Sequence, residues 1–228
     1  MSEIAQSWGD KSLVHEWLAV DAARTAILLC PTVMGVTDLE RSFARDLNAK
    51  GHAVMIADLY GARYASIQRD EASAAMGALR ADRAGLRKLL MAVLGTFRPL
   101  AVDAPIVAIG FCFGGQCALD LARSGADIAG VASFHGLLDP PGLPPLPIKA
   151  KVIAFHGWDD PLAKPESVLA LGEELSAAGC DWQIHGYGGV GHGFTNPAAR
   201  GQVPGVLYNE AAARRSWAGL DLFLGEIA

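Results

Sequence analysis

Residues 106–115 read Ile-Val-Ala-Ile-Gly-Phe-Cys-Phe-Gly-Gly, a short apolar run followed by a cysteine with glycine two residues away on each side. The apolar run is typical of a buried strand, and a helical pattern begins after Cys112. A strand that turns abruptly into a helix strains the backbone at the turn, and glycine on both sides leaves room for it. The segment therefore predicts that Cys112 lies at a helix N-terminus, where the helix dipole favours its thiolate. A buried cysteine that only fills the core is the alternative.

Composition limits the class of protein. Of the 228 residues, 51% are hydrophobic and 19% are charged, and no repeat or low-complexity tract interrupts them. These values predict one compact domain over residues 1–228. Nineteen basic residues against 24 acidic ones give a net charge of −5, and the arginines are scattered along the chain, which argues against a nucleic-acid partner.

The start of the chain and its cysteines bear on its location. Residues 1–10 contain no basic segment followed by an apolar stretch, and no window approaches the ~20 apolar residues of a membrane-spanning helix. Four cysteines in apolar surroundings without ligand-like spacing are typical of reduced thiols. We therefore expect a cytoplasmic protein with no membrane partner, no disulfide, no metal and no cofactor.

Apolar runs alternate with amphipathic segments, which predicts an α/β fold with a mostly parallel sheet and helices on both faces. The first two strands are expected to form a hairpin through residues 21–23. A proline-rich loop at residues 139–148 is too short to be a lid domain. Strands are expected at residues 14–20, 24–30, 53–57, 106–110, 130–134, 152–155 and 182–185, and helices at residues 38–50, 70–95, 113–124, 165–178 and near the C-terminus. In the long helix at 70–95, the basic residues are expected on a solvated face: Arg80, Arg83, Arg87 and Lys88.

A thiol nucleophile in acyl transfer needs a base, a group that orients the base, and donors for the oxyanion. Asp160 follows the strand at 152–155 and is the candidate orienting acid, because Gly157 and the Asp-Pro step predict a tight turn that aims its carboxylate across the sheet. Asp159 is the alternative, and either aspartate could instead cap its own turn. His192 lies in a glycine-dense loop after the last strand and is the candidate base.

The remaining histidines fit the role of base less well. His135 and His156 close strand ends and are expected to be buried, hydrogen-bonded side chains that could line a pocket. The chain order Cys112, Asp160, His192 matches the nucleophile, acid and base order of α/β-hydrolases, and the gaps leave room for the intervening strands. The first oxyanion donor is expected to be the backbone N–H of Phe113, and the second the N–H of Val33, in the loop after the strand at 24–30.

On residues 110–115, Asp160 and residues 191–194, the chain resembles the dienelactone hydrolase family of α/β-hydrolases. The loop at 34–36, the strand end at 57–61 and residues 192–196 extend the resemblance over most of the chain. The resemblance implies an α/β-hydrolase fold, a Cys-His-Asp triad on Cys112, His192 and Asp160, no cofactor, and hydrolysis of a lactone or ester through an acyl-thiol intermediate.

The chain departs from that family at two positions. Family members that open dienelactones carry a glutamate where Thr32 stands, and it takes part in activating the thiol, so activation here is expected to fall on His192 and the helix dipole. They also bind the substrate carboxylate with arginines, one of them near the position of Asn196; Arg63 or Arg80 is the candidate replacement. Thr32 and Asn196 are thus expected near the substrate, and the other expected contacts favour a small, mostly apolar acyl or lactone group: Met34, Tyr60, Phe111, Trp158 and Phe194.

The sequence therefore predicts a hydrolase, monomeric or a small homo-oligomer, whose partner is a small-molecule ester or lactone. A rival hypothesis is a non-catalytic relative that binds or senses a small molecule with the same fold. A redox role for Cys112 and Cys117 is a third hypothesis, although their spacing is not that of a C-x-x-C motif.

Overall fold

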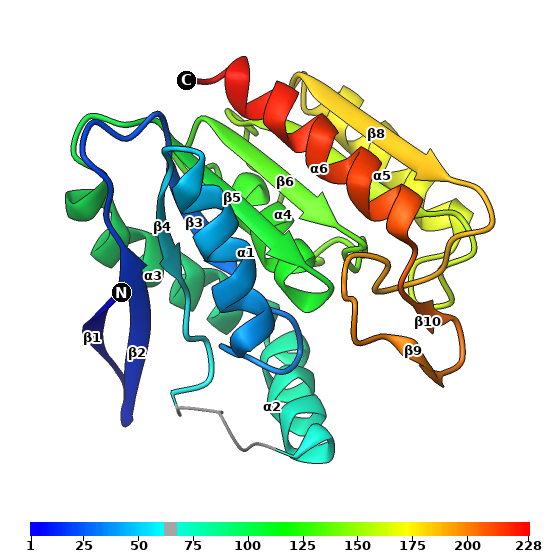
Figure 1. Ribbon diagram of the computed structural model, residues 1–228, viewed down its shortest axis with the longest axis horizontal. Coiled ribbons are helices and arrows are strands. Elements are labelled where there is room, and N and C mark those ends of the chain that lie inside the picture. Colours follow the sequence, from blue (N-terminus) through cyan, green and yellow to red (C-terminus); the bar gives the residue numbers. More distant parts are fainter. Residues whose placement is uncertain (62–67) are drawn as a thin grey trace.

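The computed structural model describes residues 1–61 and 68–228, and in these residues an eight-stranded sheet carries helices on both faces (Figure 1). The sheet is parallel from β4 to β8, and β1 and β2 add an antiparallel edge. The expected α/β class and mostly parallel sheet are confirmed. In spatial order the strands are β1 (Ser2–Trp8), β2 (Lys11–Leu18), β4 (Ala53–Ile56), β3 (Ala26–Cys30), β5 (Ile106–Phe111), β6 (Gly130–Phe134), β7 (Lys151–Gly157) and β8 (Trp182–Tyr187).

The expected hairpin between the first two sequence-predicted strands is wrong. β2 pairs with β1 on one side and with β4 on the other, whereas β3 lies between β4 and β5. Every residue of β3 is buried, as expected for a central parallel strand, while β2 is partly exposed. An apolar run reveals that a strand is buried but not which strand lies beside it. β1 escaped the sequence analysis because it is a largely polar edge strand.

Each face of the sheet packs against its own helices (Figure 1). One face carries α1 (Asp38–Ala49) and α6 (Glu210–Gly225), and the other carries α3 (Arg83–Ala101), α4 (Phe113–Arg123) and α5 (Pro165–Ala177). α1 ends before Gly51, whose φ of 89° is the left-handed conformation expected after a helix. The two apolar layers fix the sheet, so the loops at the carboxyl ends of its parallel strands have a rigid support.

The expected long helix at residues 70–95 is two helices, α2 (Arg69–Ala81) and α3. Asp82 separates them with non-helical backbone angles, and its side chain accepts a 2.8 Å hydrogen bond from the Gly85 N–H. Aspartate is a strong helix N-cap, because its side chain replaces a missing helical acceptor. The apolar period continues across this break, which is why the sequence pattern did not reveal it.

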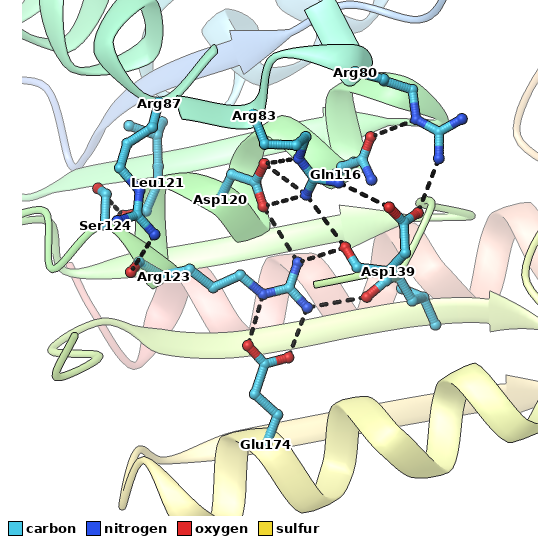
Figure 2. A network of polar contacts seen from close by, with 11 residues as sticks. Arg80, Arg83, Arg87, Gln116, Asp120, Leu121, Arg123, Ser124, Asp139 and Glu174 are labelled. Atoms are coloured by element: carbon cyan, nitrogen blue, oxygen red, sulfur yellow. Dashed lines mark hydrogen bonds and ion pairs between the residues drawn. The ribbon is translucent and has the colours of Figure 1, made fainter. Parts of the chain in front are cut away.

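The solvated face expected for the basic residues of this region is wrong for Arg83 (Figure 2). Its side chain is only 10% exposed, and its guanidinium donates to both carboxylate oxygens of Asp120 at 3.0 and 2.8 Å and to Asp139 at 2.7 Å. Asp120 also pairs with the buried Arg123, which binds Glu174 of α5. The sequence pattern places Arg83 outside the apolar stripe of α3, which suggested exposure to solvent. In the structure α4 packs against that side of α3 and buries the side chain.

A short hairpin follows the last strand of the sheet, formed by β9 (Arg200–Val203) and β10 (Val206–Leu207). This hairpin was not predicted, because both strands are short and mostly exposed. In residues 1–61 and 68–228, no helix combines the length and the apolar character needed to cross a bilayer.

Candidate active site

The turn between β5 and α4 has the strained geometry that its glycines suggest. Cys112 has a φ of 57°, which a residue with a side chain adopts only at an energetic cost. A Cβ atom on Gly110 would collide with the backbone of Gly114, and one on Gly114 would collide with the carbonyl oxygens of Cys30 and Pro31. The two glycines therefore let the first turn of α4 lie directly against the loop that follows β3.

Asp160 and His192 meet at the carboxyl edge of the sheet, as expected. The Nδ1 atom of His192 lies 2.7 Å from Oδ2 of Asp160, and both side chains are almost fully buried. Oδ1 of Asp160 accepts a 2.8 Å hydrogen bond from the Leu162 N–H, which fixes the carboxylate. The side chain of Asp159 is exposed, and its N–H donates to the carbonyl of Val190 at 2.9 Å. Asp160 is thus the aspartate that contacts the imidazole.

The β9–β10 hairpin holds the histidine loop. The N–H of His192 donates to the carbonyl of Gly205 at 2.8 Å, and the N–H of Leu207 donates to the carbonyl of His192 at 3.1 Å. The loop that carries Asp160 is joined to the same segment by the bond from Asp159 to Val190. Three segments are therefore bonded to one another through their backbones, which limits the freedom of the imidazole.

Cys112 and His192 influence each other's protonation. Burial raises the pKa of the Cys112 thiol, but the contact with His192 and the backbone N–H groups of Phe113 and Val33 outweigh it, so this pKa lies below that of a free thiol. Burial lowers the pKa of His192, but Asp160 and Cys112 together raise it to about 10. Nε2 of His192 is buried and has no hydrogen-bond partner within the described residues. Each group therefore favours the charged form of the other, a thiolate beside an imidazolium.

The other three cysteines differ from Cys112. Burial raises the pKa of Cys30 to about 12 and that of Cys117 well above the ordinary thiol value. Burial also raises the pKa of Cys180. All four cysteines are free thiols, and Cys112 is the one whose surroundings favour the anion.

Two further histidines lie close to the candidate site. His135, with a φ of 37°, follows β6; its Nε2 lies 2.8 Å from Oγ1 of Thr195, and its ring lies edge-on to His192 with centroids 5.0 Å apart. Burial lowers its pKa well below the ordinary value, so it is neutral. His156 is buried, but neither ring nitrogen makes a hydrogen bond within the described chain, which differs from the expected hydrogen-bonded histidine.

The loop after β3 is tied down by a residue that the sequence analysis missed. Glu40 of α1 is completely buried, and its Oε1 accepts hydrogen bonds from the N–H and the hydroxyl of Thr32, at 3.0 and 2.8 Å. Its Oε2 accepts from the N–H of Thr37 at 3.0 Å and from the Thr37 hydroxyl. The spacing of Thr37 and Glu40 is that of a capping box, and this signal could have found the pair.

The residues expected around the substrate are dispersed. Phe111 packs between Phe43 and Phe134 on the α1 side of the sheet, and Phe194 is fully buried against His135 and Tyr187, so both belong to the core. The backbone directs both rings into the apolar layer between sheet and helices. An aromatic residue in a sequence does not by itself reveal whether it lines a pocket or packs in the core.

Other residues expected to contact the substrate form hydrogen bonds or packing contacts within and beside the loops. Tyr60 stacks on Phe113 and donates its hydroxyl to the carbonyl of Val33 at 3.2 Å, while Asn196 accepts a turn bond from the Ala198 N–H. Trp158 is 42% exposed and lies against Gly186 of β8. Met34 is half-buried beside Thr32.

No described contact places Arg63 or Arg80, the two expected sources of positive charge, beside the thiol of Cys112. The guanidinium of Arg80 donates to Gln116 at 3.0 Å and to Asp139 at 3.0 Å (Figure 2). Arg63 lies outside the described residues. Among residues 1–61 and 68–228, no three His, Cys, Asp or Glu side chains are arranged to hold a metal ion.

The candidate site is identified by its reactive groups and not by the volume of a cavity. A cavity of about 700 Å³ lies between the loop at 139–148 and α5, and its walls include none of Cys112, Asp160 and His192. The polar groups that could carry out a reaction converge instead at the carboxyl ends of β3, β5, β7 and β8. That edge is where parallel sheets place their sites.

Known proteins share sequence and fold with this chain. A curated relative, the uncharacterized protein K02A2.1 of Caenorhabditis elegans, is 36% identical over 155 residues, which is 65% of this chain and 98% of that protein. The solved structure of m3DLH is 33% identical with a TM-score of 0.88, and the alignment covers 99% of this chain and 97% of the other.

A second solved structure is described as the dienelactone hydrolase-like promiscuous phosphotriesterase P91 from metagenomic libraries. It is 30% identical with a TM-score of 0.89, and the alignment covers 99% of this chain and 97% of that one. The model of the dienelactone hydrolase family matches residues 17–228. This match includes every segment that forms the candidate site, and the chain belongs to the dienelactone hydrolase family.

Proposed function

We propose that this protein hydrolyses a carboxylic ester or lactone with Cys112 as nucleophile, His192 as general base and acid, and Asp160 as the residue that orients the imidazole. The observation that carries the proposal is the 2.7 Å contact between His192 and Asp160 at the edge of the sheet where the strained turn presents Cys112. The lowered pKa of Cys112 and the raised pKa of His192 agree with it. A thiolate beside an imidazolium is the resting form that a cysteine hydrolase needs, because the thiolate attacks and the imidazolium supplies a proton.

In the first half of the reaction, Sγ of Cys112 attacks the substrate carbonyl carbon and the carbonyl π electrons move to its oxygen. The N–H groups of Phe113 and Val33 stabilise that oxyanion. When the oxyanion collapses, the carbon–oxygen bond to the leaving alcohol breaks, and His192 transfers its proton to that oxygen. The product of this half is a thioester on Cys112; for a lactone the released hydroxyl stays on the acyl chain.

In the second half, water attacks the thioester while neutral His192 accepts a proton from it. The carbon–sulfur bond breaks, the carboxylic acid leaves, and the thiolate and imidazolium are restored. Asp160 keeps Nδ1 protonated throughout, so that Nε2 exchanges the proton. No oxidant, reductant or metal enters this balance, and water is the co-substrate.

The test is turnover of an activated aryl ester by a Cys112→Ala variant. We expect turnover to fall to the uncatalysed rate, while Cys180→Ala, which removes another partly exposed thiol, keeps the wild-type rate. Mass spectrometry of the wild type after brief exposure to esters and lactones should show an acyl adduct on the peptide that contains Cys112. Equal turnover by Cys112→Ala would refute the proposal, and tight binding without any adduct would favour the non-catalytic rival.

Phosphotriester hydrolysis is a second candidate, favoured by the 30% identity to P91 over nearly the whole chain. The same thiolate would attack phosphorus in place of carbon, and the P–O bond to the leaving alcohol would break as His192 protonates its oxygen. Water would then cleave the S–P bond, with His192 as base, and restore the thiolate. Turnover of a nitrophenyl phosphotriester that disappears in Cys112→Ala would support it, whereas turnover of carboxylic esters alone would exclude it.

The four free thiols also agree with the expected cytoplasmic location, where thiols stay reduced.

A further inference from the structure

The burial of Glu40 is more than helix capping requires. A capping box needs only one carboxylate oxygen on Thr37, and such residues are usually exposed. Here the carboxylate is completely buried, and its other oxygen is bonded to Thr32, outside the helix. A buried carboxylate is costly unless donors surround it, and four N–H and O–H donors of Thr32 and Thr37 do so. These bonds join α1 to the loop that contains Val33.

Tyr60 holds the same loop from the other side. Oδ1 of Asp58 accepts the N–H groups of Tyr60 and Gly61, at 2.9 and 3.0 Å, and thereby fixes the turn after β4. The Tyr60 ring is parallel to that of Phe113, with centroids 6.4 Å apart, and its hydroxyl donates to the carbonyl of Val33 at 3.2 Å. The loop is thus linked to the first residue of α4.

These contacts determine the direction of the Val33 N–H. The peptide bond between Thr32 and Val33 is planar, so its N–H points opposite to the Thr32 carbonyl. That carbonyl accepts the Gly35 N–H at 3.0 Å, in a turn at which Gly35 has a φ of 73°. With Glu40 on Thr32 and Tyr60 on the Val33 carbonyl, both sides of this peptide are restrained. The loop lies directly against the first turn of α4, where a Cβ on Gly114 would collide with the carbonyl oxygens of Cys30 and Pro31, and the Val33 N–H contributes to the lowered pKa of Cys112.

We infer that Glu40 and Tyr60 are positioning residues that aim the Val33 N–H at the reacting atoms, an inference that rests on the proposed function. Both act through the loop, because Glu40 accepts hydrogen bonds from Thr32 and Tyr60 donates one to the Val33 carbonyl. Preorganised donors lower the barrier because they need no reorientation when the oxyanion forms.

The experiment compares Glu40→Leu and Tyr60→Phe with the wild type in the full chain. Loss of one oxyanion donor costs roughly 100- to 1000-fold in kcat, so a misdirected donor should reduce kcat by roughly 10- to 100-fold and leave KM nearly unchanged. The second readout is the pH dependence of Cys112 alkylation by iodoacetamide. Its midpoint should rise in both variants, because the thiolate loses a hydrogen-bond donor.

Asp38→Ala is the matched control, because it removes an acidic residue from the first turn of α1 and its ion pair with Arg41 but leaves every bond to Glu40 in place. We expect a lower Tm with unchanged kcat and alkylation midpoint. An equal loss of kcat in Asp38→Ala would make helix stability the cause and overturn the inference, as would unchanged kcat and midpoint in folded Glu40→Leu and Tyr60→Phe. Alkylation needs no turnover, so an inactive wild type would refute the proposed function while the midpoints still test the loop.

Discussion

Nδ1 of His192 and Oδ2 of Asp160 lie 2.7 Å apart although 32 positions separate them in the chain. The contact forms because β7 and β8 are neighbouring parallel strands whose carboxyl ends carry the two loops. The loops are also bonded directly, from the Asp159 N–H to the Val190 carbonyl. The imidazole therefore has one orientation and one nitrogen free to face the thiol.

Asp160→Asn should reduce kcat by roughly 10³- to 10⁴-fold, because an amide donor at this position favours the wrong imidazole tautomer. The measurement is steady-state hydrolysis of an activated ester. Asp159→Asn is the control and should retain wild-type kcat, since the Asp159 side chain is exposed. Equal activity of the two variants would contradict the role given to Asp160.

Alkylation of Cys112 should proceed at neutral pH and slow as the pH falls through its lowered pKa. His192→Ala should move the midpoint of this profile above the ordinary thiol value, because removal of the cation leaves burial as the main influence. Mass mapping after timed exposure to iodoacetamide gives the rate for each cysteine. Cys30 and Cys117 are buried with raised pKa values and should stay unmodified; similar rates at all four cysteines would disprove the assignment.

Asp120→Asn should lower the free energy of unfolding by roughly 3–5 kcal/mol, because it leaves the guanidiniums of Arg83 and Arg123 buried without this carboxylate. Asp221→Asn removes an exposed ion pair with Lys50 and should cost about 0–1 kcal/mol. Urea denaturation of both variants provides the comparison. Similar losses of unfolding free energy in the two variants would show that the buried ion pairs of Asp120 stabilise the protein no more than an exposed pair does.

Gly114→Ala should destabilise the protein by about 3 kcal/mol or more, because its Cβ would collide with the carbonyl oxygens of Cys30 and Pro31. Gly95→Ala is the matched change in a helix: Gly95 has open space around it and the substitution should stabilise by about 1 kcal/mol. Thermal unfolding of the two variants checks the opposite signs. A stable Gly114→Ala variant would mean that the first turn of α4 and the loop after β3 do not need close contact.

The sequence alone predicted what short-range chemistry determines. The strand, turn and helix around Cys112 follow from glycine and apolar spacing, and the α/β class follows from the alternation of strands and helices. The chain order of Cys112, Asp160 and His192 was readable because each residue follows a strand and parallel strands end at one edge.

Tertiary structure alone decided which elements are neighbours. The insertion of β4 between β2 and β3, the burial of Arg83 against Asp120 and the bonds from Glu40 to Thr32 depend on packing between segments distant in sequence. Local patterns do not encode these contacts, because the same apolar run or acidic residue suits several surroundings. A side chain's role is then set by the element that packs against it, which is why Phe111 is part of the core and Glu40 is bonded to the loop after β3.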